Sequence, residues 1–94
     1  MTTQKSIDIN CDLGESINPQ QWEADSRLMP YISSCNIACG GHAGNQESIK
    51  VTITNAIHNQ LNIGAHPSYP DKDNFGRVTM KIREQELRQT LRQQ

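Results

Sequence analysis

Apolar and polar residues alternate near the start of the chain, over residues 6–13. Isoleucine, cysteine and leucine fill the odd-numbered positions, whereas the even-numbered positions include Asp8, Asn10 and Asp12. This period of two predicts a β-strand, because successive side chains of a strand point to opposite faces. A glycine would end the strand, and Glu15 follows just beyond it. The polar side chains would share one face, which either meets solvent or lines the interior of a barrel.

Two later apolar runs of strand length each lead into small residues and a histidine. Residues 33–39 stop at a pair of glycines followed by His42, and residues 61–65 lead directly to His66. Between these runs, Asn45 can cap a helix that reaches about residue 59. Apolar residues recur at helical spacing in this segment and predict its buried face: Ile49, Ile53, Ala56 and Ile57.

The order strand, helix, strand predicts that the two histidines are neighbours. Such a unit is right-handed in nearly every case, and its two parallel strands end at the same edge of the sheet. If the strand at 6–13 runs parallel to them, Asp12 joins His42 and His66 at that edge. One carboxylate and two imidazoles suit a metal site or acid–base catalysis. The alternative is that both histidines satisfy hydrogen bonds in unrelated turns.

The remaining segments have weaker patterns. Residues 16–23 have the composition of a loop, and Asp25 can cap a short helix whose length Pro30 limits. Residues 67–77 form a long loop rich in proline, aspartate and glycine. Three residues of that loop are suited to contact a ligand or fix a lid: Tyr69, Phe75 and Arg77. A final helix would begin near Glu84, where leucines lie one turn apart.

Composition narrows the classes of function. The chain has 94 residues and a net charge of -1, so we expect one small domain without a basic face for nucleic acid. No run approaches the roughly 20 apolar residues that a membrane span requires. Residues 1–5 lack the apolar core of a signal peptide. We therefore expect a cytoplasmic protein that binds neither nucleic acid nor a membrane.

The three cysteines are odd in number and lie in or beside apolar segments: Cys11, Cys35 and Cys39. This favours reduced, buried thiols over a disulfide framework. A zinc site built from Cys35, Cys39 and His42 is an alternative, although their spacing matches no strong zinc pattern.

Four segments together resemble the LamB/YcsF family: residues 8–16, 36–44, 63–71 and 74–77. Members of that family are the A-type subunit of the bacterial ATP-dependent 5-oxoprolinase. The resemblance implies a (β/α) barrel related to the glycoside hydrolase/deacetylase folds. It also implies ATP-driven opening of the lactam 5-oxo-L-proline to L-glutamate, carried out with two partner subunits.

The resemblance suggests roles for the candidate residues. In a lactam-opening reaction, Asp12, His42 and His66 would supply base catalysis, bind a divalent metal, or stabilise developing charge. The side chains expected to contact the substrate are Asn10, Glu15, Tyr69 and Arg77. The chain contains no Gly-x-x-x-x-Gly-Lys-Ser/Thr loop, so any contact with ATP would come from other backbone amides or from residues outside this chain.

Family members are much longer than this chain. We therefore expect an α/β structure, an incomplete (β/α) barrel of the glycoside hydrolase/deacetylase type with three parallel strand-helix units. Residues 1–94 would be a single N-terminal fragment of the barrel domain, and inactive alone. Three strands cannot close a barrel, so an open edge and an uncovered apolar face would favour self-association or completion by another chain.

Two other functions compete with lactam hydrolysis. A divalent metal between Asp12, His42 and His66 would favour a metal-dependent, deacetylase-like carbohydrate hydrolase. A non-catalytic assembly module would be favoured if the fragment is all that the cell makes.

Overall fold

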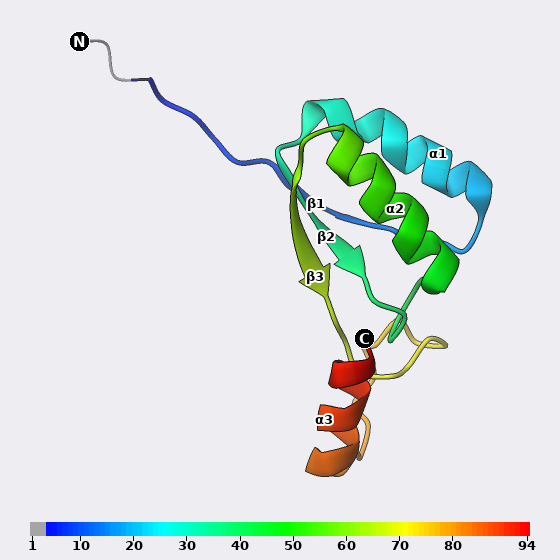
Figure 1. The fold of residues 1–94 in the computed structure, drawn as a ribbon. Helices are drawn as coiled ribbons and strands as arrows, with labels where there is room; N and C mark the ends of the chain where they lie inside the picture. Colours follow the sequence, from blue (N-terminus) through cyan, green and yellow to red (C-terminus); the bar gives the residue numbers. More distant parts are fainter. Residues whose placement is uncertain (1–3) are drawn as a thin grey trace.

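The computed structural model describes residues 4–94, and the first three residues of the predicted N-terminal segment lie outside this range. One parallel sheet has the strand order β1 (Asn10–Leu13), β2 (Ser34–Ala38), β3 (Asn62–His66). The helical elements are α1 (Pro19–Leu28), the 3-10 turn η1 (Met29–Tyr31), α2 (Gln46–His58) and α3 (Glu84–Gln93). Figure 1 shows α1 beside α2 against the sheet, while α3 lies beyond the arrowheads of the strands. The predicted α/β class with three parallel strand-helix units is confirmed.

The first strand is shorter than its alternating pattern predicts. Residues 6–9 lie outside β1, and the side chains of Ile7 and Ile9 are 82% and 50% exposed. The reason is pairing, because β2 begins at Ser34, which lies opposite Asn10. The carbonyl of Ile9 still accepts from the N–H groups of Ser33 and Ser34, at 3.0 and 3.2 Å, and the regular ladder ends there.

The predicted loop over residues 16–23 is wrong, because α1 begins within it. The Asn18 side chain accepts a hydrogen bond of 2.9 Å from the backbone N–H of Gln20, and Pro19 occupies the first helical position. Proline fits there because that N–H has no partner within the helix. Asp25 therefore lies inside α1 instead of capping it, and its carboxylate accepts from the Gly14 N–H at 3.1 Å.

The second helix is the one that the sequence predicts. Asn45 and Ser48 cap it reciprocally: Asn45 Oδ1 accepts from the Ser48 N–H at 2.8 Å, and Ser48 Oγ accepts from the Asn45 N–H at 2.7 Å. Of its predicted buried face only Ala56 is fully buried, whereas Ile53 and Ile57 are 37% and 64% exposed.

The core lies between the sheet and the helices. It consists of buried apolar side chains from both layers: Leu13, Met29, Cys35, Ile37, Ala56 and Leu61. Beside it, an apolar hollow of about 330 Å³ runs along α2 and β3 and is lined in part by Ile49, Ile53, Ile63 and Ala65. Within residues 4–94, β3 pairs only with β2, so its outer edge is open, and Ile53 and Ile57 of α2 stay exposed.

The opposite face of the sheet is polar, as the alternation predicts. The amide of Asn36 donates to Asn10 Oδ1 at 2.7 Å and to Asp12 Oδ1 at 3.3 Å. Asn10 in turn donates to Ser34 Oγ at 2.8 Å. These bonds join β1 to β2 above the backbone ladder. Among the described residues, no helix combines the length and apolar character needed to cross a bilayer.

Candidate functional site

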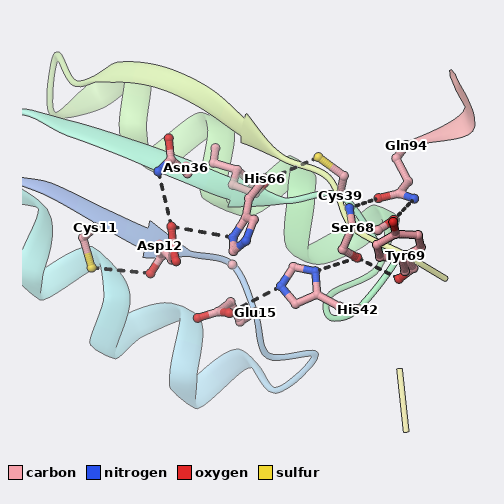
Figure 2. A network of polar contacts seen from close by, with 12 residues as sticks. Cys11, Asp12, Glu15, Asn36, Cys39, His42, His66, Ser68, Tyr69 and Gln94 are labelled. Atoms are coloured by element: carbon pink, nitrogen blue, oxygen red, sulfur yellow. Dashed lines mark hydrogen bonds and ion pairs between the residues drawn. The ribbon is translucent and has the colours of Figure 1, made fainter. Parts of the chain in front are cut away.

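The three predicted catalytic side chains come together at the C-terminal ends of the strands. Asp12 comes from β1, His42 from the loop after β2, and His66 from the end of β3. The imidazole centroids are 4.6 Å apart, and Asp12 Oδ1 lies 3.6 Å from His66 Nδ1. Figure 2 shows these side chains converging at one edge of the sheet. This convergence follows from parallel strands that share an edge.

A tight turn after β2 places His42. The Gly40 N–H donates to the Ala43 carbonyl at 3.0 Å, and Gly40 has a φ of +93°, which glycine adopts without strain. Gly44 has a φ of +80°, and a Cβ there would lie 2.8 Å from the Gly14 carbonyl oxygen. Both glycines are therefore required by backbone geometry, and the turn leaves His42 only 3% exposed.

The ring nitrogens of His42 face two different groups. Nδ1 lies 3.0 Å from Ser68 Oγ, and Nε2 lies 3.5 Å from a carboxylate oxygen of Glu15. The edge of the ring meets Phe75, with centroids 4.7 Å apart. His42 Nε2 is fully buried and has no hydrogen-bond partner, and the same is true of Nδ1 of His66.

Ser68 is itself held by Gln94, which follows α3. The Ser68 N–H donates to Gln94 Oε1 at 2.9 Å, and Gln94 Nε2 donates to the Ser68 carbonyl at 2.8 Å. The Ser68 hydroxyl donates to the Tyr69 carbonyl at 2.9 Å. Figure 2 shows this chain of contacts running from Gln94 through Ser68 to His42. The position of Ser68, and with it the orientation of the His42 ring, thus depends on the end of α3.

A polar pocket of about 360 Å³ surrounds the two histidines. Its lining residues come from three strand exits and from the loop after β3: Asp12, Glu15, His42, His66, Ser68, Phe75, Gly76 and Arg77. The Arg77 guanidinium lies 5.4 Å from the centre of the Phe75 ring. The pocket therefore combines carboxylates, imidazoles and one guanidinium, which are groups for proton transfer, metal binding and anion recognition.

Two of the predicted substrate contacts lie away from this pocket. Asn10 is further back on the polar face of the sheet, bonded to Ser34 and Asn36. Tyr69 is 47% exposed and lines a neighbouring hollow that it shares with Arg77. The loop approaches the histidines at Ser68 and again at residues 75–77, whereas the side chain of Tyr69 between them lies outside the pocket.

The predicted metal-binding set changes in one member. Among the described residues, the group able to offer three ligand atoms is Glu15, His42 and His66, whose candidate atoms lie within 4.8 Å of one another. Asp12 instead contacts His66 from the sheet. Glu15 takes its place because Gly14, with a φ of +70°, turns the chain toward His42 at the end of β1.

Sequence reasoning missed Ser68 and did not place Phe75 and Gly76 against His42. The sequence signal that could have placed this part of the loop was the pair Phe75-Gly76, whose residues have φ angles of +56° and +69°. A Cβ on Gly76 would lie 3.2 Å from His42 Cβ, so a glycine allows the loop to approach the ring. Ser68 carried only the weak signal of a hydroxyl two residues after a strand exit.

The cysteines do not form a metal site with His42 in the part of the chain that the structure describes. Cys35 is buried in the core, and burial raises its pKa. Cys39 is half-buried, less than predicted, and its thiol donates to the Ile37 carbonyl at 3.2 Å. The three cysteines are free thiols, and burial also raises the pKa of Cys11.

Comparison with known proteins gives consistent matches. The sequence model of the LamB/YcsF family matches residues 7–94. The chain is 42% identical over 89 residues to the A-type 5-oxoprolinase subunit of Vibrio cholerae, covering 95% of this chain and 36% of that protein. It is 44% identical over 86 residues to an A-type 5-oxoprolinase subunit of Pseudomonas putida, covering 92% of this chain and 33% of that protein.

A solved structure agrees with the fold. The lactam utilization protein of Thermus thermophilus matches with a TM-score of 0.76 and 31% sequence identity, over 94% of this chain and 40% of that one. The chain spans about a third of the length of the curated relatives that it matches. The resemblance seen in the four sequence segments is thereby confirmed.

Proposed function

Because this chain belongs to the LamB/YcsF family, we propose that it is part of an A-type 5-oxoprolinase subunit, which opens 5-oxo-L-proline to L-glutamate with ATP hydrolysis. The names of its relatives support this assignment. The observation that carries it is the pocket at the strand ends, where two carboxylates, two imidazoles and one guanidinium converge. The chain alone is expected to be inactive, since it spans about a third of the length of its curated relatives.

Arg77 is the proposed anchor for the substrate carboxylate. It lines the pocket, and within residues 4–94 it forms no ion pair with a carboxylate of the chain. A guanidinium binds a carboxylate through two parallel hydrogen bonds, which fixes both position and orientation. Phe75, beneath the guanidinium, offers an apolar wall for the methylene groups of the lactam ring.

The carboxylate and imidazole groups of the pocket are assigned to the reacting carbonyl. Transfer of a phosphoryl group from ATP to the amide oxygen makes the ring carbon electrophilic. Water can then add to that carbon, and the ring C–N bond breaks with its electron pair leaving on nitrogen. A second water releases phosphate from the resulting acyl phosphate. We assign Asp12 as the base for the attacking water, and His42 and His66 as the groups that stabilise charge on oxygen.

ATP and partner subunits complete the proposal. At the N-terminus of α2, the capping box occupies the N–H groups of Asn45 and Ser48, so those two amides are not available to a phosphate. ATP contacts would therefore come from other backbone amides or from residues outside this chain.

We place the complex in the cytoplasm, a reducing compartment that suits three free thiols.

The test uses a full-length protein with these residues, reconstituted with its partner subunits. His42→Ala and His66→Ala are expected to abolish ATP turnover that depends on 5-oxoproline, with circular dichroism unchanged. His58→Ala is the matched control, because this histidine is exposed at the end of α2 and should leave turnover intact. Turnover within a few-fold of wild type for both site variants would overturn the proposal.

A metal-dependent deacetylase is the second candidate. Its support is the group Glu15, His42 and His66, which can offer three ligand atoms. It predicts release of acetate from N-acetylated sugars without ATP, in a reaction that a chelator abolishes. Lactam opening that requires ATP would exclude it.

A further inference from the structure

The hydrogen bonds around Ser68 define which nitrogen of His42 carries a proton. The Ser68 hydroxyl has one proton, and it donates that proton to the Tyr69 carbonyl. Its oxygen must then accept from His42 Nδ1, 3.0 Å away. A neutral imidazole protonated at Nδ1 has a lone pair at Nε2.

That lone pair lies on a buried nitrogen and faces the carboxylate of Glu15. His42 Nε2 lies 3.5 Å from Glu15 Oε2, the His42 side chain is 2% exposed, and Nε2 has no hydrogen-bond partner. Two electron-rich atoms that face each other are unfavourable unless a proton or a metal ion lies between them. The ring of His66 lies 4.6 Å from that of His42, so both imidazoles can reach the same point.

We infer that Glu15, His42 and His66 bind a divalent transition metal ion, with Asp12 as the group that orients His66 from behind. Two imidazoles and one carboxylate are a ligand set of catalytic zinc sites, which keep a further position open. Nitrogen ligands favour Zn²⁺ or Co²⁺ over Mg²⁺ and Ca²⁺. The candidate ligand atoms already lie within 4.8 Å of one another, with His42 buried and both Glu15 and His66 half-buried.

The other ring nitrogen of each histidine lies near an oxygen, which fits this assignment. A metal-bound histidine commonly donates its other ring N–H to an oxygen, which fixes the orientation of the ring. Ser68 Oγ takes this place for His42, and the Asp12 carboxylate lies 3.6 Å from His66 Nδ1. Asp12 is also held by the amide of Asn36 at 3.3 Å. The site therefore has an inner set of ligands and an outer set of oxygens.

This inference deepens the proposed function. The role of the metal rests on that function, whereas metal binding itself does not. A bound cation would polarise the lactam oxygen, so His42 and His66 would stabilise charge there through the ion. Asp12, 48% exposed in its side chain, remains accessible to the attacking water. Arg77 holds the substrate carboxylate at the other side of the pocket.

Metal binding is tested directly on the full-length protein after removal of metal with a chelator. Titration with Co²⁺, followed by its visible absorption, and calorimetry with Zn²⁺ should both show one ion bound per chain. Glu15→Gln should weaken Zn²⁺ binding by more than about 100-fold, and Asp12→Asn by about 10- to 100-fold. Glu47→Gln, at an exposed acid of the first turn of α2, should leave binding unchanged.

Each other outcome has a definite meaning. Absence of a Co²⁺ spectrum, or equal affinity in wild type and Glu15→Gln, would overturn the site. A larger loss for Asp12→Asn than for Glu15→Gln would overturn the assignment of ligands. Tight binding without lactam turnover would support the site and contradict the proposed function, whereas full turnover by the metal-free complex would refute the role of the metal alone.

Discussion

The turn that presents His42 can be tested at Gly44. An alanine Cβ there would lie 2.8 Å from the Gly14 carbonyl oxygen and 2.9 Å from Ser48 Oγ, and the φ of +80° is unfavourable for any residue with a Cβ. The left-handed backbone costs about 1–2 kcal/mol. Overlap with a backbone carbonyl adds about 1–3 kcal/mol, since the neighbouring turn must move. Gly44→Ala should therefore lower the free energy of unfolding by about 2–5 kcal/mol.

Gly40 provides the matched control for this experiment. Its φ is +93°, yet a Cβ there would have no atom within 4 Å. Gly40→Ala should then cost only the backbone strain, about 1–2 kcal/mol. Urea unfolding of the full-length protein, followed by circular dichroism, measures both losses. Equal losses for the two variants would show that steric contact at Gly44 does not determine the turn.

Two further predictions concern the substrate and the open edge of the sheet. Arg77→Gln should raise the KM of the full-length complex for 5-oxoproline at least about tenfold while kcat changes less, because the proposed contact of this guanidinium with the substrate carboxylate lies away from the reacting carbonyl; an unchanged KM would contradict this role. Residues 1–94 alone should self-associate at micromolar concentrations through β3 and the apolar hollow beside it, and Ile63→Lys should reduce this association in light scattering. A stable wild-type monomer with cooperative unfolding would remove that idea.

The parts of the fold that were predictable have strong periodicity. The helix capped by Asn45 follows from helical spacing and a clear cap; the helix and its cap were confirmed, whereas most of its predicted buried face is exposed or half-buried. The segment over residues 16–23 failed because Asn18 and Pro19 are residues of turns and also of helix starts. The first strand was predicted too long. Alternation reports only which way the side chains point, whereas the length of the strand depends on its partner, which begins at Ser34.

The candidate site was likewise predictable only in part. Asp12, His42 and His66 could be brought together from sequence because parallel strands end at one edge. Glu15 and Phe75 could not be placed, because they follow loop backbone whose direction depends on single positive φ angles at Gly14 and at Phe75 itself. Such angles depend on packing around the loop and leave little pattern in the sequence.

The paired hydrogen bonds between Gln94 and Ser68 have a consequence for the chemistry of the pocket. One side-chain amide satisfies both backbone groups of Ser68, much as a neighbouring strand would. A glutamate at this position would keep the acceptor and lose the donor. Because Ser68 Oγ lies 3.0 Å from His42 Nδ1, the same amide also fixes the oxygen that this ring nitrogen meets, so Gln94 helps to orient a buried imidazole through Ser68.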